Sequence, residues 1–219
     1  MKVTLLSFTG NGDELAGQAA AICTRSSNYE KALAHAMRGG HESVIEHVPF
    51  TLMVEGVNRA LLAQLTRHRI ASFSVESQRY CDMGEMPMVI PPSILNNPEI
   101  LNDYAIAMDA VKAFYKKAVR AGIPKEDARY ATPQAAVTNL IITMNARELR
   151  HFFSLRCCNR AQWEIRAMAD EMLRLCKEKC PVIFSDAGPG CVRGACPEEK
   201  PCGNPRMAED LFRPWNKED

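Results

Sequence analysis

Apolar residues follow two spacings along the chain, and together they predict a mixture of strands and helices. Short apolar runs rich in β-branched or aromatic residues predict strands at residues 2–8, 50–54 and 137–144. Apolar residues at helical spacing predict helices over residues 14–23, 28–37, 58–67, 98–121 and 161–179. The elements follow no regular strand–helix–strand alternation, so the expected fold class is α+β.

Residues at element ends sharpen this prediction. Asn145 is a good N-cap, and Glu148 follows three residues later as in a capping box, so a further helix is expected to begin there. Pro124 predicts the start of a short helix. After Asp186 the composition changes to Gly, Pro and Cys. This change predicts a domain over residues 1–186 and a tail over residues 187–219 that packs on the domain or is partly mobile.

Composition excludes several classes of protein. Of 219 residues, 47% are hydrophobic and 24% charged, which is typical of a soluble globular domain and excludes disorder throughout. No apolar run approaches the ~18–20 residues that a membrane span needs, and the N-terminus resembles a first strand rather than a signal peptide. The net charge of +1 does not favour nucleic acid or an acidic membrane as a partner. Nine cysteines, an odd number without a visible export signal, favour the reducing cytoplasm.

Positive charge is concentrated in one segment of this nearly neutral chain. The segment of residues 57–80 contains four arginines and a single acid, Glu76. The basic side chains there are those of Arg59, Arg67, His68, Arg69 and Arg79, and serines at 72, 74 and 77 lie among them. Forked charged donors and small hydroxyl residues around a turn are typical of phosphate binding. The alternative for Arg67 alone is that it complements the dipole at a helix C-terminus.

The helix expected after Asn145 carries a second candidate. Leu149, Phe152 and Phe153 define an apolar face, and Arg156 continues it. An arginine on the buried side of a helix needs an anion, because an unpaired buried charge is very costly. The anion is either a ligand or a core carboxylate in a structural ion pair. The other face carries Arg147, His151 and Leu155, and by itself it predicts a solvated surface.

Two histidines and two acids lie close together between Gly40 and His47. His41 and His47 are six residues apart, so their rings lie on different sides of a helix and a metal face with two histidines is not expected. A histidine in this setting is more often a hydrogen-bonding residue than a metal ligand.

The basic segment and its flanks resemble a known family. Arg67-His68-Arg69, seven residues, then Ser77-Gln78-Arg79 matches the RHR-x7-S-x-R signature of the flavin-dependent thymidylate synthases, the ThyX family. Further matching segments follow the family order and spacing: Gly40-His41-Glu42-Ser43 with Glu46-His47, Gln64, Arg129, Asn145-Ala146-Arg147, Leu155-Arg156, and Ala161-Gln162-Trp163-Glu164-Ile165. The resemblance covers roughly residues 1–185 and leaves only the Cys-rich tail outside.

The resemblance implies a reaction, a fold and an assembly. Members methylate dUMP to dTMP, taking the carbon from 5,10-methylenetetrahydrofolate and the hydride from reduced FAD, which NADPH usually reduces. The implied fold is a single α+β domain, a mixed sheet with flanking helices. Members form homotetramers whose active sites are shared between subunits.

The resemblance also implies residue roles. FAD would contact His41, Ser43, Glu46, Arg67, His68, Arg69, Asn145, Arg147, His151 and Leu155. The dUMP substrate would contact Gln64, Arg67, Ser77, Gln78, Arg79, Arg129 and Arg156. Among these, Arg156 would also be catalytic, stabilising charge on the uracil ring.

The chain departs from the family pattern at two places. Many members have Asn-Glu where this chain has Ser74 and Val75, and the acid falls one place later at Glu76. A role for a carboxylate at the Val75 position is therefore not expected here. His151 stands where some members have Asn, and both side chains can donate a hydrogen bond.

The remaining chemistry leaves one rival interpretation, a zinc- or nucleic-acid-binding interaction protein. It would use Cys191, Cys196 and Cys202 of the tail, together with Cys180, as metal ligands. These spacings differ from the C-x2-C of a zinc knuckle. Pro201-Cys202-Gly203 lacks the His of the classical synthase nucleophile, and no base is adjacent to Ser77. We therefore expect no metal site, and none of the nine cysteines as the nucleophile.

Overall fold

The computed structural model describes residues 1–207 and 211. The chain divides into two compact units. Unit 1 contains Met1, Glu55–Gln64 and Ser74–Leu140, and unit 2 contains Lys2–Val54, Leu65–Phe73 and the chain from Ile141 onward. No helix within the described part of the chain is long and apolar enough to cross a membrane.

One four-stranded antiparallel sheet supplies residues to both units. Its strands are β1 (Lys2–Phe8), β2 (Pro49–Asn58), β3 (Ala71–Val75) and β4 (Val137–Asn145), in the order β1-β2-β4-β3. The α+β class, a sheet with flanking helices, is confirmed. All neighbouring strands of the sheet are antiparallel.

Strand β3 is the element that the sequence analysis did not predict. Its residues alternate between half-buried and exposed positions, with Ala71, Phe73 and Val75 on the covered side. Alternation with a period of two is the signature of a half-buried strand. The serines at 72 and 74 were interpreted only as hydrogen-bond donors around a turn, whereas their spacing also placed them on the open face of a strand.

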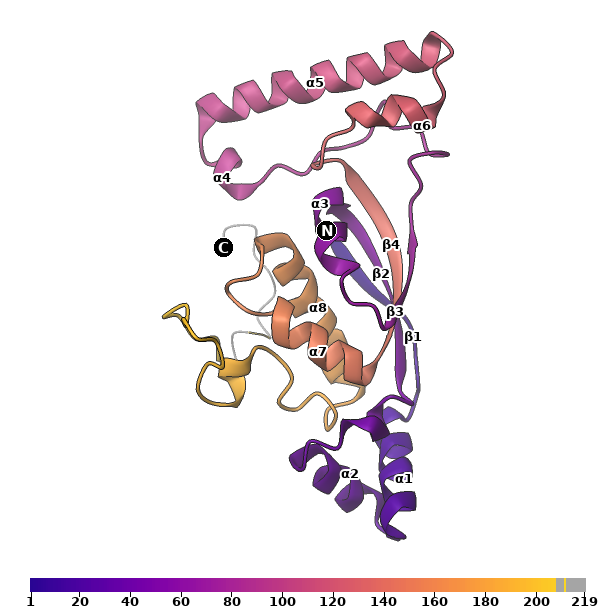
Figure 1. Cartoon of the computed structure of the whole chain (residues 1–219), viewed down its shortest axis with the longest axis vertical. Coiled ribbons are helices and arrows are strands. Elements are labelled where there is room, and N and C mark those ends of the chain that lie inside the picture. The colour runs from indigo at the N-terminus through magenta and orange to yellow at the C-terminus, as the bar shows by residue number, and fades with distance from the viewer. Residues whose placement is uncertain (208–210, 212–219) are drawn as a thin grey trace. The chain divides into compact units, whose positions relative to one another are not determined.

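Unit 2 contains two pairs of helices. The first pair, α1 (Gly12–Thr24) and α2 (Tyr29–Arg38), is followed by a short 3-10 helix, η1 (Glu42–Ile45). The second pair, α7 (Ala146–Arg156) and α8 (Trp163–Lys179), lies side by side (Figure 1). Three fully buried phenylalanines, Phe50, Phe153 and Phe184, form a chain of edge-to-face contacts in its core. Such aromatic contacts add to the stabilisation that burial provides.

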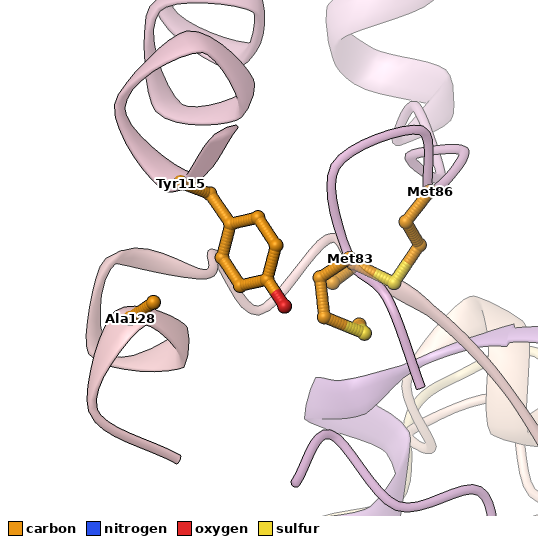
Figure 2. Packing of buried hydrophobic residues seen from close by; sticks show 5 residues of the cluster. Met83, Met86, Tyr115 and Ala128 are labelled. Atoms are coloured by element: carbon orange, nitrogen blue, oxygen red, sulfur yellow. The ribbon is translucent and has the colours of Figure 1, made fainter. Parts of the chain in front are cut away.

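Unit 1 has a smaller core. Its elements are α3 (Arg59–Leu65), whose last residue belongs to unit 2, then α4 (Pro92–Leu95), α5 (Pro98–Arg120), α6 (Lys125–Ala128) and the 3-10 helix η2 (Arg129–Ala131). Figure 2 shows the ring of Tyr115 lying between Ala128 and the side chain of Met83. Tyr115 is the single buried residue of the long helix α5. The other α5 side chains are partly or fully exposed, including Ile100, Ile106 and Phe114.

The described part of the Cys-rich tail packs on unit 2. One nitrogen of Arg206 donates to both carboxylate oxygens of Asp170, each at 2.8 Å, and to the carbonyl of Cys157 at 2.8 Å. Asn159 donates to the carbonyl of Asn204 at 2.9 Å. These contacts join the described part of the predicted tail to the rest of unit 2. Residues 208–210 and 212–219 of the predicted tail lie outside the described residues.

Candidate functional site

Helix α7 begins where its capping residues predict. The side chain of Asn145 accepts a hydrogen bond from the backbone N–H of Glu148 at 2.9 Å. The two faces of the helix are also as predicted, because Leu149, Phe152 and Phe153 are fully buried whereas Arg147, His151 and Leu155 are exposed. The cap thus fixes the direction in which the first turn presents its polar side chains.

A cavity of about 450 Å³ lies in unit 2 beside the start of α7. It is lined by Glu42, Glu46, Ile70, Asn145, Arg147, Glu148 and His151. Four of these seven residues, Glu46, Asn145, Arg147 and His151, are candidate flavin contacts from the sequence. Arg147 forms an ion pair with Glu46, which holds both side chains at the wall of the cavity. The structure therefore gathers residues that lie about a hundred positions apart in the sequence.

A second polar cluster in unit 2 centres on His68. The imidazole Nδ1 lies 3.0 Å from a carboxylate oxygen of Glu148, and Arg156 Nε donates to the imidazole Nε2 at 3.2 Å. His68 is 4% exposed and Glu148 is 7% exposed. Burial lowers the pKa of His68 and the charge of Arg156 acts in the same direction, against the opposing effect of Glu148. The imidazole is therefore neutral at pH 7.

Arg156 does not occupy the fully buried position that its helical face predicted. It is half-buried and is the last residue of α7. Burial and the nearby charge of Arg67 both lower the pKa of Arg156. Two guanidinium groups that raise each other's energy create a local positive potential that favours an anionic ligand.

The remaining candidate flavin residues are spread over the surface of unit 2. His41 precedes η1, Ser43 lies within it, and Arg67 and Arg69 follow α3; all four are exposed. None of the four lines the 450 Å³ cavity, and Leu155 lines a different one. That second cavity, of about 550 Å³, lies between residues 154–161 and the tail.

Unit 1 carries most of the candidate dUMP residues. Gln78 is buried, and within residues 1–207 and 211 nothing accepts a hydrogen bond from its side-chain nitrogen. A buried amide donor without an acceptor is costly, so it is suited to bind an acceptor group of a ligand. Ser77 uses its hydroxyl locally, accepting from the backbone N–H of Arg79 at 3.3 Å.

Three further candidates of unit 1 lie on short helices and beside them. Arg79 forms an ion pair with Glu126, with Nε and Nη2 each 2.8 Å from the same carboxylate oxygen. Arg129 donates to the backbone carbonyl of Glu126 at 3.1 Å. Gln64 is partly buried in α3. The two arginines thus converge on the first turn of α6, and Glu126 competes with any anionic ligand for Arg79.

The acid that departs from the family pattern has a structural partner. The carboxylate of Glu76 accepts from the side-chain amide of Asn139 at 3.0 Å, and that amide's oxygen accepts from the backbone N–H of Gly56 at 2.9 Å. Val75 ends strand β3 and is half-buried. Glu76 therefore ties β4 to its neighbours rather than replacing a carboxylate at position 75.

Two charged residues of α7 were not selected from the sequence. Glu148 was interpreted only as a capping residue, but its carboxylate reaches His68. Arg150 is the arginine of α7 that is buried with carboxylate partners: it contacts Glu42 at 2.9 Å and Asp186 at 2.7 Å. Glu148 lies four positions before the buried Phe152, and Arg150 lies three positions before the buried Phe153, so the helical period could have placed both toward the interior.

Three buried cysteines, Cys157, Cys176 and Cys180, have raised thiol pKa values. Burial raises the pKa of Cys157 and of Cys176 well above the ordinary thiol range, and raises that of Cys180 to about 12. A protonated thiol is neither a nucleophile nor a metal ligand. In the part of the chain that the structure describes, no three His, Cys, Asp or Glu side chains are placed to hold a metal ion.

Comparisons with known proteins identify the family of the chain. A family model described as "Thymidylate synthase complementing protein" matches residues 4–182. The chain belongs to this family. A relative from Geobacter sulfurreducens named "Flavin-dependent thymidylate synthase" is 46% identical over 228 residues, which cover 97% of this chain and 98% of the relative.

Two further relatives carry the same name. The protein from Clostridium tetani is 42% identical and the alignment covers 97% of each chain, and the protein from Pyrococcus furiosus is 40% identical with 90% of each chain covered. The match to the family model ends at residue 182, whereas the Geobacter and Clostridium alignments span nearly all of the chain. The resemblance seen in the sequence is thereby confirmed for the family.

Proposed function

We propose that this protein is a flavin-dependent thymidylate synthase that converts dUMP to dTMP with 5,10-methylenetetrahydrofolate as the carbon donor. The observation that carries the proposal is the cavity in unit 2, where Glu46, Asn145, Arg147 and His151 lie together at the start of α7. The names of full-length relatives support the same activity.

The residues at this cavity have the chemistry that FAD binding requires. Arg147 offers a charged fork to the diphosphate, with Arg67 and Arg69 as further exposed cations of the same unit. Carboxylates and the Asn145 amide can accept hydrogen bonds from ribose and ribityl hydroxyls. His41, Ser43 and Leu155 complete the proposed set of FAD contacts, whereas His68, also expected from the resemblance, is buried and both of its ring nitrogens have protein partners. When bound and reduced by NADPH, FAD supplies the hydride for the methyl group.

Each unit carries some of the residues proposed to bind dUMP. In unit 1, Ser77, Arg79 and Arg129 would bind the phosphate, while Gln78 offers a buried amide donor to the base or sugar. Gln64 would contribute a further contact. In unit 2, Arg67 and Arg156 would bind the nucleotide. Its negative charge would offset the repulsion between the two guanidinium groups. Arg156 would stabilise negative charge that develops on the uracil ring during the reaction.

A homotetramer with shared active sites is part of this proposal. Helix α5 supports it, because Ile100, Ile106 and Phe114 leave large apolar side chains exposed along a 23-residue helix that buries only Tyr115. Contact with further copies of the chain would cover them. We propose a cytoplasmic location, which fits nine cysteines that are all free thiols.

The test combines a spectrum with product analysis. We expect the purified protein to bind FAD non-covalently and to form dTMP anaerobically when given dUMP, methylenetetrahydrofolate and NADPH. Arg147→Ala should weaken FAD binding at least ~10-fold, since a charged hydrogen bond contributes roughly 1.5–3 kcal/mol. Arg38→Ala, which removes an exposed arginine at the end of α2, is the matched control and should change nothing. A protein that neither binds flavin nor forms dTMP would exclude the proposed function.

A further inference from the structure

The hydrogen bonds around His68 have a fixed direction. An arginine Nε carries a hydrogen and has no lone pair to offer, so at the 3.2 Å contact with Arg156 the imidazole Nε2 must accept. In a neutral imidazole the other nitrogen then carries the proton, and Nδ1 donates to Glu148 at 3.0 Å. The contacts therefore select one tautomer of His68, and Glu148 is the acceptor that holds it.

The surroundings of His68 keep this arrangement neutral and rigid. The charged or titratable groups that face its ring are Glu148, Arg156 and His151, all from α7. The ring also contacts Phe152 edge to face, with 4.9 Å between centroids. Because His68 and Glu148 are both nearly inaccessible to water, neither side chain can exchange its partner for solvent without a local opening of the structure.

The position of Glu148 in α7 is that of a capping-box residue, but its carboxylate does not cap the helix. Glu148 occupies the third position of α7, from which a capping-box glutamate returns to the backbone N–H of the cap residue. Here the backbone half of that motif forms, with Glu148 N–H donating to Asn145, but the carboxylate reaches His68 instead. Holding a buried carboxylate away from the helix end costs free energy that a structural cap alone would not require.

We propose that Glu148 is a positioning residue for the reaction: it fixes the tautomer of His68, so that His68 accepts from Arg156 Nε and sets the plane of that guanidinium toward the nucleotide. The guanidinium is planar, so anchoring Nε fixes the directions of its other N–H groups. A misorientation of a group that acts on developing charge affects the rate more than binding. This inference rests on the proposed function and assigns Glu148 a role in it.

The prediction separates two variants of the same residue. Glu148→Gln retains a carbonyl oxygen that can accept from Nδ1–H, so the tautomer and the orientation of Arg156 should persist. Glu148→Ala removes the acceptor, and His68 can then place its proton on Nε2, where it opposes the Arg156 donor. At saturating FAD and dUMP we expect kcat to fall at least ~10-fold in the alanine variant and no more than ~3-fold in the glutamine variant. Glu30→Ala, an exposed acid in the first turn of α2, is the matched control and should retain the wild-type kcat.

Tautomer spectroscopy tests the inference without any turnover. Imidazole nitrogen NMR of the wild-type protein, assigned with His68→Gln, should show His68 as the neutral Nδ1–H form at pH 7.5, and Glu148→Ala should lose that signature. A cationic or Nε2–H form of His68 in the wild type would overturn the proposal. This result does not depend on whether the alanine variant folds. Equal losses of kcat in both variants would overturn it too, because charge rather than tautomer would then matter. If the wild type shows the expected tautomer but forms no dTMP, the result would instead count against the proposed function.

Discussion

Two candidate contacts, one in each unit, are held in opposite ways. In unit 2, the contact between His68 and Glu148 is buried, with side chains that are 3% and 8% exposed. In unit 1, the ion pair between Arg79 and Glu126 is about half exposed, at 53% and 48%. A buried contact is fixed before any ligand arrives, whereas an exposed ion pair contributes little and exchanges readily. His68 is therefore oriented before a ligand binds, whereas Arg79 carries charge that a ligand can redirect. The ion pair between Arg147 and Glu46 in unit 2, at 52% and 44%, is exposed like the Arg79 pair.

The largest expected effect separates Arg156 from Arg79. Arg156→Lys keeps the charge but loses the planar fork and the Nε contact with His68. Loss of one oriented donor in a water-poor site is typically worth ~2.7–4 kcal/mol of barrier, or roughly 10²–10³ in rate. We expect stopped-flow flavin re-oxidation at saturating dUMP to slow by about that factor.

Arg79→Lys provides the contrast from unit 1. It should raise the KM for dUMP while leaving re-oxidation at saturation within about threefold of wild type, because a point charge still attracts phosphate. An Arg156→Lys enzyme that re-oxidises at the wild-type rate would reduce Arg156 to a binding role. Loss of FAD from that variant would contradict the placement of the helix.

The next effect concerns stability rather than rate. Cys157 is fully buried and its thiol interacts with the carboxylate of Asp170. Cys157→Ala should lower the free energy of unfolding by about 1–3 kcal/mol, because it leaves a small cavity and removes one interaction of the Asp170 carboxylate, which keeps its hydrogen bonds from Arg206. The half-buried Cys81 of unit 1 is the control, and Cys81→Ala should cost less. Urea unfolding measures both, and a folded, flavin-loaded Cys157→Ala protein without turnover would overturn the view that no cysteine is the nucleophile.

A smaller effect is the dependence of stability on pH. Burial lowers the pKa of His68 in the folded protein below the ordinary value of 6.5. As pH falls below about 6.5, the unfolded chain binds a proton at this residue and the folded protein does not, so the free energy of unfolding decreases; above 6.5 the effect is absent. We expect urea midpoints of the wild type to drop more between pH 7.5 and 5.5 than those of His68→Gln. Parallel curves for the two proteins would show that His68 is not held neutral.

The sequence predicted the elements better than it predicted the two-unit arrangement. Asn28, Asn97 and Asn145 each cap the helix that follows, because a short polar side chain before a helical run satisfies backbone N–H groups locally. Strand β3 was missed because its serines were interpreted as donors around a turn. Its period-two alternation was visible in the sequence, but its pairing with β4, far along the chain, was not. Such pairing is decided by tertiary contacts that local propensity does not contain.

The candidate site shows the same limit. The signature around Arg67 and Arg79 indicated which residues to examine, and spacing on α7 separated the exposed from the buried face. Spacing could not reveal that Glu148 reaches His68, because the two residues are 80 positions apart. It also could not place Arg79 and Arg67 in different units. Local pattern therefore identified side chains of the right chemistry, and only the fold assigned their partners.

The smallest expected effect tests the exposed pair of unit 1. Glu126→Gln removes the carboxylate that Arg79 contacts but keeps the size of the side chain and the backbone carbonyl that accepts from Arg129. An exposed ion pair contributes roughly 0–1 kcal/mol, so stability should change by no more than about 1 kcal/mol. Because Glu126 competes with the nucleotide phosphate, dUMP should bind up to about threefold more tightly at low salt. The difference should shrink at high salt, where exposed charges are screened. Isothermal titration of dUMP at two salt concentrations measures both effects. A large loss of dUMP affinity would mean that Glu126 orients Arg79, as Glu148 is proposed to orient Arg156. The contrast between these two contacts would then no longer hold.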